Sequence, residues 1–460
     1  MRKILLLALL LLTIAKIAAV LARGPVPIEL DASEYWKLST LVMEGDPLLY
    51  GRKIAYRTPV YPCFLAVVRM FAGPRSLLAV VILQGVFSLS TLLIAASIAS
   101  RATKLPSAFN WTLLVALPAI AAFVFGAAVL SESLFVFLLM LNLLAVLDYA
   151  KHGNGARAIW VGMTFAVTLL TRPIAMLIWI PHLLFLLHIH LRKNRRLRSH
   201  GMKTIAMRRR LGHLFVAGLT TLTIVAPWLI RNHALFGKPF ITEFVGRNIW
   251  IVTFQDGSGA GLELPKTAEA EELTRRLDNV GVTDNWRHTW TVSKALVRSG
   301  LDDASADRLM KSVSLSAARE SPREFGYKAF RRVVNFWRAA ATELPPQASE
   351  GNYFGQQTWH RSIPAIDWAI RYRWSQSVWL NTLLLGGLVG ALLLLIINAP
   401  TRPYAIWIAL ILAYFSIVTG ILEIPAYRYR IVVEPLVAAS YGAAIAVMCS
   451  RRRKPAEVAG

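Results

Sequence analysis

The chain has 460 residues, 55% of them hydrophobic, and a formal net charge of +25. Several uninterrupted apolar stretches are long enough to cross a hydrocarbon core of about 30 Å, so the composition predicts an all-α polytopic membrane protein. The basic excess has a simple source in the Lys and Arg of cytoplasmic loops, which argues against nucleic acid as a partner. The two cysteines, Cys63 and Cys449, lie near opposite ends of the chain, so no disulfide framework is expected.

Apolar runs of about 15 to 23 residues predict ten or eleven membrane spans. The ten that can be delimited cover residues 4–22, 77–99, 109–125, 134–149, 158–170, 173–191, 211–230, 378–398, 403–422 and 431–449. The first run follows a basic start and closes with small residues, so a cleaved signal peptide is an alternative, but its length favours a retained span. Lys and Arg gather on one side of the spans, which the positive-inside rule marks as cytoplasmic. These cations lie at residues 2–3, 101–104, 151–157, 192–210, 402 and 451–454.

The remaining connections are then extracytoplasmic, as expected for a multi-pass protein of the plasma (inner) membrane. They comprise residues 23–76, 126–133, 171–173, 231–377 and 423–430. We predict three regions, namely a transmembrane module whose first exterior loop is residues 23–76, an exterior helical segment, and C-terminal spans with a short basic cytoplasmic tail. Their boundaries are residues 1–230, 231–377 and 378–460.

The exterior segment contains its own predicted helices, at residues 267–279 and 285–299. A third begins at Ser321-Pro322, where serine caps and proline takes the first helical position. Its apolar residues are interleaved with cations, so we expect this interfacial helix to lie flat on the outer membrane surface. The glycine-rich stretch 254–261 matches no phosphate-loop pattern and is predicted to be a mobile turn, with a lid over a site as the alternative.

The first exterior loop holds the strongest chemical signal. Asp31 and Glu34 lie three residues apart, and Arg57 follows just before a proline-containing turn. Carboxylates held at a bilayer surface with a cation nearby suit chemistry on a lipid phosphate. Phosphate is best bound by forked, permanently charged guanidinium groups, so Arg57, Arg428 and Arg430 are the candidate phosphate ligands. The alternative for each is an interfacial arginine whose stem snorkels at a helix end.

Four further residues are candidates for the same site: Tyr61, Glu132, Arg172 and Arg231. Glu132 starts a predicted span, where an unpaired buried carboxylate would cost several kcal/mol, so we expect it to have a partner. Arg172 and Arg231 are the expected partners, and a purely structural role is the alternative for both.

Metal chemistry is not indicated. His288 and His360 in the exterior segment show no metal-ligand spacing. We predict no metal site and no obligatory cofactor, because arginines can stabilise a leaving phosphate by themselves. A divalent cation stays open as an alternative.

Five motifs in order along the chain resemble the GT-C glycosyltransferases, and more narrowly the family-39-like membrane enzymes related to protein O-mannosyltransferases and the lipid A aminoarabinose transferase. They are Asp31-x-x-Glu34, Arg57-x-Pro-x-Tyr61-Pro62, Ser131-Glu132-Ser-Leu-Phe135, Pro227-Trp228-Leu-Ile-Arg231-Asn232, and Tyr427-Arg428-Tyr429-Arg430 with Glu434-Pro435. The resemblance implies a GT-C fold and transfer of a monosaccharide from a polyprenyl-phosphate donor to an extracytoplasmic lipid, glycan or protein, usually with inversion.

Residue roles also follow from this resemblance. It implies that Asp31 is the catalytic base, with Glu34 beside it, and that Arg57 and Arg428 bind the carrier phosphate. Arg430 matches the closing motif. Protein O-mannosyltransferases carry the two acids side by side, whereas two residues separate Asp31 and Glu34 here.

Topology favours the same donor, because nucleotide sugars are cytoplasmic and an exterior site needs a sugar that has already crossed the membrane. A transporter or flippase of a lipid-linked sugar is the alternative of a different class. Such transporters usually place ionisable residues near the bilayer midplane and show internal repeats. Here the acidic residues of the spans cluster near their ends, which favours the transferase. A polymerase or ligase of surface polysaccharide would differ only in its acceptor.

Overall fold

The computed structural model describes residues 2–22, 28, 30–117, 129–194, 200–255, 261–282, 284–338, 377–424 and 427–453. Every regular element within these ranges is a helix, which confirms the predicted all-α class. Residues 118–125 of the third predicted span, residues 256–260 of the glycine-rich turn, and His360 lie outside the described residues.

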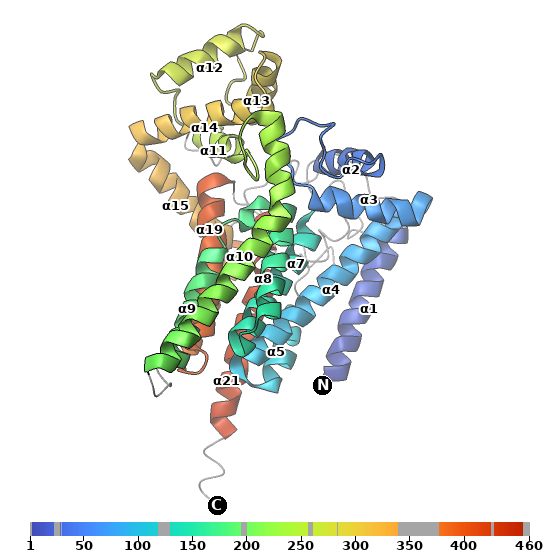
Figure 1. The fold of residues 1–460 in the computed structure, drawn as a ribbon, viewed down its shortest axis with the longest axis vertical. Coiled ribbons are helices and arrows are strands. Elements are labelled where there is room, and N and C mark those ends of the chain that lie inside the picture. Colours follow the sequence, from blue (N-terminus) through green and yellow to red (C-terminus); the bar gives the residue numbers. More distant parts are fainter. Residues whose placement is uncertain are drawn as a thin grey trace, which may run out of the picture.

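Long helices form the body of the molecule, and each predicted span overlaps one of them (Figure 1). They are α1 (Arg2–Ala22), α4 (Ser76–Thr103), α5 (Pro106–Ala116), α7 (Glu132–His152), α8 (Gly155–Thr171), α9 (Trp179–Asn194), α10 (His200–Phe236), α18 (Ser377–Ile397), α19 (Arg402–Leu422) and α21 (Glu434–Arg453). Among the described residues, five helical stretches are long and apolar enough to cross a membrane, and Gly155–Thr171 and Asn381–Ile397 are shorter apolar helices. The chain is therefore a multi-pass membrane protein.

The main core lies around α7, whose Leu139, Met140 and Leu143 are fully buried. Trp407 and Phe415 of α19 belong to the same apolar cluster. A helix that is apolar on all sides can be buried in this way in the middle of a bundle. The core thus fixes how the helix ends meet at either end of the bundle.

The two bundle ends differ in charge and in what covers them. The start of α1 and the end of α21 lie at the lower end in Figure 1. At the connection between α7 and α8, Asp148 contacts Arg157 at 2.6 Å and Arg101 at 3.4 Å. The opposite end carries α2 (Leu30–Met43) and α3 (Val60–Ala72). The short helices of the exterior segment also lie at this upper end (Figure 1).

Four of these short helices pack around their own apolar core, which includes Trp250, Phe254, Leu273 and Met310. They are α11 (Val245–Phe254), α12 (Ala268–Asp278), α13 (Thr289–Arg298) and α14 (Asp303–Glu320). The prediction of a helix at 267–279 is confirmed. The second predicted helix starts four residues late, at Thr289 rather than 285, because the His288 side chain caps it by accepting from Thr291 N.

The helix predicted from Ser321-Pro322 is α15 (Pro322–Arg338). One of its faces packs on α19, where Arg332 Nε donates to Gly420 O at 2.7 Å. Tyr327 and Phe330 are 58% and 65% exposed, so the described part of the chain leaves an apolar part of this helix uncovered. Its contact with the membrane surface stays a prediction, as do the two boundaries between the three regions, the first of which falls within the continuous helix α10.

Candidate active site

Asp31 and Glu34 lie on helix α2, not in an extended loop. Residues three apart on a helix are neighbours on one face, so the two intervening residues bring both carboxylates to the same side. Asp31 stands in the first turn, where the positive end of the helix dipole favours a carboxylate. The spacing that separates this chain from the protein O-mannosyltransferase motif therefore still gives a paired set of acids.

Arg57 bridges these two acids from the loop that leads into α3. Its Nη2 donates to Asp31 Oδ1 at 2.6 Å and its Nε to Glu34 Oε2 at 2.8 Å. Its guanidinium also lies 4.6 Å from the centre of the Tyr35 ring, a cation–π distance. Glu34 is held a second time, since Tyr56 OH donates to its Oε1 at 2.5 Å. The Arg57 side chain, only 14% exposed, is thus fixed from two directions.

Arg428 and Arg172 complete the group from the other side. Arg428 Nη1 donates to Asp31 Oδ2 at 2.9 Å, and its Nε donates to Glu132 Oε1. Arg172 Nη1 lies 2.7 Å from the same Glu132 oxygen. Glu132 is fully buried, and its Oε2 has no hydrogen-bond partner among the described residues. Glu132 thus has the arginine partner that the sequence predicts.

These six side chains form one cluster of three carboxylates and three guanidinium groups, which we call the carboxylate–arginine cluster. Its members are Asp31, Glu34, Arg57, Glu132, Arg172 and Arg428. They come from α2, the loop before α3, the start of α7, the end of α8 and the short helix α20 (Tyr427–Arg430). Formal charges of −3 and +3 cancel, so the cluster is neutral as a whole.

The charge state of Asp31 follows from its neighbours. Burial alone would raise the pKa of Asp31, but the guanidinium groups of Arg57 and Arg428 outweigh it and hold this pKa well below its usual range. The acids and Tyr35 likewise outweigh the burial of Arg57 and raise its pKa. Asp31 is therefore ionised at neutral pH, and each of its two oxygens is engaged by an arginine.

A cavity of about 320 Å³ opens beside the cluster. Arg57 and Arg172 line it, together with Glu423, which directly follows α19. The rest of the wall is largely apolar and aromatic and includes Tyr56, Met176, Leu177, Phe244, Val418 and Leu422. An apolar cavity with a few convergent polar groups is typical of a ligand site.

Glu423 is the functional candidate that the sequence did not single out. Tyr429 OH donates to its Oε2 at 3.1 Å. Burial raises the pKa of Glu423 to about 7, against the lowering effects of Tyr429, Arg428 and Arg172. The sequence offered one indication of Glu423: it directly follows the predicted span 403–422, in a connection predicted to lie on the same side of the membrane as Asp31. Nothing in the pattern, however, shows that this carboxylate faces a cavity.

Three predicted site residues lie outside the cluster. Arg430 donates to Trp337 O at 2.9 Å and lies 3.5 Å from Glu434. Tyr61 is fully buried and donates to Gln84 Oε1 at 3.0 Å. Its ring packs edge-on against Tyr35, 4.8 Å between centres, so it supports one of the residues that contact Arg57.

Arg231 is the third of these residues, and it lies fully buried beneath the loop that carries Arg57. It donates to the backbone oxygens of Leu49, Arg52 and Ile54 at 2.6 to 3.0 Å. All three acceptors belong to the segment just before Arg57. Arg231 therefore stabilises the conformation of the loop before Arg57 and does not join the cluster.

The same loop is anchored from the exterior helices, by residues that sequence reasoning missed. Asp303 Oδ2 accepts from Ala55 N at 2.7 Å, and its Oδ1 accepts from Arg247 Nη2 at 2.5 Å. Arg247 is 1% exposed and also contacts Asp307 at 3.2 Å. Such isolated charges carry no motif, so only the tertiary fold shows that they hold Arg57 in place.

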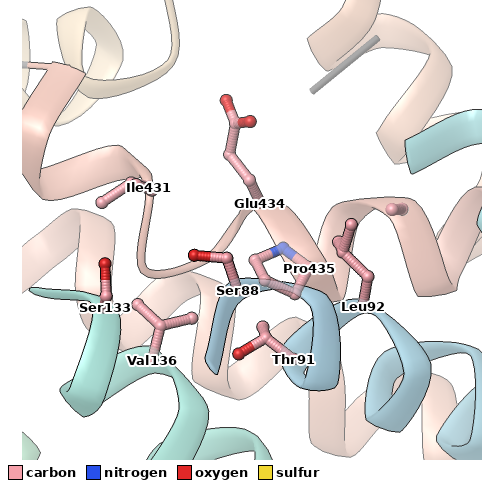
Figure 2. A pocket seen from close by; sticks show the side chains of 9 residues that line it. Ser88, Thr91, Leu92, Ser133, Val136, Ile431, Glu434 and Pro435 are labelled. Atoms are coloured by element: carbon pink, nitrogen blue, oxygen red, sulfur yellow. The ribbon is translucent and has the colours of Figure 1, made fainter. Parts of the chain in front are cut away.

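A second, much smaller cavity of about 30 Å³ lies between α4, α7 and α21 (Figure 2). Its volume is about the volume that one water molecule occupies in the liquid. Figure 2 shows the carboxylate of Glu434 directed away from Ser88 and Thr91. The buried Thr91 hydroxyl has no partner in the described part of the chain, so this cavity is suited to a single bound water.

The predicted absence of a metal site and of a cofactor stays a prediction. Within the described ranges, no three His, Cys, Asp or Glu side chains come together in a group that could hold a metal ion. His288 is used as the cap of α13. The polar groups that the described residues bring to this site are carboxylates, guanidinium groups and tyrosine hydroxyls.

A model of the Alg9-like mannosyltransferase family matches residues 36–244 of the chain. The match begins just after Asp31 and Glu34 and includes Arg57, Glu132 and Arg172. No curated protein matches the chain.

Two solved structures of ArnT from Cupriavidus metallidurans are similar at 14% identity. The structure bound to undecaprenyl phosphate covers 98% of this chain and 78% of its own, with a TM-score of 0.39. The apo structure covers 92% and 77%, with a TM-score of 0.40. The family match and the all-helical membrane architecture support a GT-C membrane glycosyltransferase, the class that the ordered motifs predict.

Proposed function

We propose that this glycosyltransferase moves a monosaccharide from a polyprenyl-phosphate carrier to an acceptor on the extracytoplasmic side of the membrane. The observation that carries the proposal is the cavity that combines two cluster arginines, Arg57 and Arg172, with walls from membrane helices. A phosphate on a long apolar chain needs both features, cations for its head and an apolar surface for its tail.

The distribution of charge supports an extracytoplasmic position for this site. Helix α2, which carries Asp31 and Glu34, lies at the end of the bundle opposite the start of α1 and the end of α21 (Figure 1). The loop cations predicted to be cytoplasmic include Arg2, Arg101, Arg157 and Arg402, which lie at the ends of helices remote from the cluster. The positive-inside rule then supports an extracytoplasmic site, where a nucleotide sugar is not available.

In the proposed reaction, a hydroxyl or amine of the acceptor attacks C1 of the sugar. The bond between C1 and the phosphate oxygen breaks, and its electron pair leaves with the polyprenyl phosphate. Arg57 and Arg428 would stabilise the charge that develops on that phosphate, since guanidinium groups form paired, charge-assisted hydrogen bonds to it. Arg430 would support this indirectly, because it ties α20, and with it Arg428, to α15.

The resemblance assigns the base to Asp31, and this assignment stays a prediction. Each Asp31 oxygen accepts a hydrogen bond from Arg57 or Arg428, and these guanidinium groups hold the pKa of Asp31 well below its usual range. Asp31 would become a better proton acceptor once a guanidinium has turned to the donor phosphate. Glu34 shares Arg57 with Asp31 and would keep that arginine in place during the exchange.

The test uses purified protein in phospholipid vesicles with a small panel of polyprenyl-phosphate monosaccharides. We expect release of polyprenyl phosphate from at least one donor, and no turnover of the same sugars linked to nucleotides. Turnover of a nucleotide sugar would contradict the proposed donor. Movement of a labelled donor across the bilayer with its sugar bond intact would favour the flippase alternative instead.

A further inference from the structure

Two carboxylates of this chain compete for the role of proton acceptor, and they stand in opposite environments. Asp31 is held by Arg57 and Arg428, one at each oxygen, and it does not line the large cavity. Glu423 lines that cavity and accepts a single hydrogen bond, from Tyr429. Within the described residues, Glu423 has no ion-pair partner within 4 Å.

The position of each carboxylate relative to the substrate matters as much as its freedom to accept a proton. Glu423 shares the cavity with Arg57 and Arg172, so a substrate whose phosphate contacts these arginines places its neighbouring sugar inside the space that Glu423 faces. A base must come within hydrogen-bond reach of the proton that it takes, directly or through one water. Asp31 is not among the residues that line this cavity, and its pairing with two arginines makes it a weak proton acceptor.

We propose that Glu423 is the catalytic residue that accepts the proton of the acceptor, while Asp31 positions Arg57 and Arg428. This inference rests on the proposed function and names a residue in that same site. In the step itself, the acceptor oxygen forms its bond to C1 of the sugar as the bond from C1 to phosphate breaks. The acceptor proton passes to a Glu423 oxygen and later leaves to solvent.

The charges that face Glu423 are consistent with this role. Burial raises its pKa to about 7, which Asp31 on α2 reinforces, while Tyr429 and Arg428 on α20 and Arg172 after α8 lower it. A general base works best when its pKa lies near the working pH. A donor phosphate on the same arginines would add negative charge and raise this pKa further in the complex.

The experiment compares wild type with E423Q, E423D and D31N, each shown to be folded by size exclusion and thermal unfolding. The readout is release of polyprenyl phosphate in vesicles, with water as the acceptor so that a missing acceptor cannot stop the reaction. For wild type we expect kcat/KM to rise with pH through about 7, because the carboxylate of Glu423 must be unprotonated.

E423Q should lose about 10²- to 10⁴-fold in kcat/KM, the usual contribution of a general base, and should lose the rise with pH. E423D keeps a carboxylate and should keep that rise at reduced rate. D31N should keep it too, with a higher KM for the donor. E423Q with the rate and pH dependence of wild type would overturn the inference and leave the proposed function intact. Loss of the pH dependence in D31N alone would return the base to Asp31.

A second pair of variants tests the same carboxylate without removing it. Y429F deletes the hydrogen bond that stabilises the ionised form of Glu423, so the rise with pH should shift to higher pH. Y414F is the matched control, because its hydroxyl lines the same cavity region but donates to Ile174 O. Equal shifts in both variants would show that the titration does not belong to Glu423, and wild type that turns over no donor would overturn the proposed function and this inference with it.

Discussion

Replacement of Arg57 by lysine should weaken donor binding while the positive charge is kept. Arg57 makes two charge-assisted contacts, to Asp31 at 2.6 Å and to Glu34 at 2.8 Å, with separate nitrogens of one planar fork. A lysine ammonium is a point charge and cannot hold both acids and also turn a paired face to a phosphate.

The size of the effect follows from the number of bonds lost. One hydrogen bond to a charged group contributes about 1.5 to 3 kcal/mol, and each 1.4 kcal/mol is a factor of ten in affinity. R57K should therefore raise the Kd for a polyprenyl phosphate by about 10- to 150-fold. R57A would be less informative, because removal of one partner from a buried ion pair typically costs about 3 to 5 kcal/mol of stability.

The assay is calorimetric titration of a polyprenyl phosphate, the leaving group itself, into protein in neutral phospholipid vesicles. R69K is the matched control, since Arg69 on α3 donates to Trp36 O and to nearby hydroxyls and has no contact with the cluster. R69K should bind like wild type. If folded R57K also binds like wild type, Arg57 does not contact the phosphate and the reasoning from the cluster is refuted.

Two further substitutions test how the site is built. E132Q keeps the shape of a fully buried side chain but removes the negative charge between two arginines. It should destabilise the protein by about 3 kcal/mol, which would be measured as a lower thermal midpoint in detergent. An unchanged midpoint would contradict the pairing of Glu132 with these arginines. G420A places a methyl group 2.4 Å from Val333 Cγ2 and 2.8 Å from Val333 N, so it should cost about 1 to 3 kcal/mol by pushing α15 away from α19. G386A, where nothing lies within 4 Å, is the control and should not be destabilised, and equal losses in both would argue against this contact.

Much of the fold was predictable because membrane helices are defined by a strong, local signal. Each predicted span overlaps a helix. The side of the membrane that each connection takes stays a prediction from its cations. The helix that begins at Pro322 was predictable from its proline and cap. The packing of that helix was not, since the approach of Arg332 to Gly420 depends on two segments that are far apart in the chain.

The candidate site was predictable as a set of residues, but not as a set of contacts. All six members of the carboxylate–arginine cluster were named from the sequence, because topology brings the same ends of several helices to one side. Arg231 and Arg430 were named for the same reason and lie elsewhere. An arginine at a helix end gives the same sequence signal whether it faces a carboxylate or a backbone carbonyl. Glu423 shows the converse, since its importance depends on a cavity wall that several distant segments create.

The position of Arg57 couples the membrane bundle to the exterior helices. The segment before it is held from the bundle by Arg231 of α10, which binds three of its backbone oxygens. It is held from the exterior helices by Asp303 of α14, which binds Ala55 N only two residues from Arg57. A displacement of α11–α14 would therefore shift the backbone next to Arg57 and the Tyr56–Glu34 hydrogen bond beside it. An acceptor bound on α11–α14 would thus act indirectly on Arg57, the arginine that we propose binds the donor phosphate.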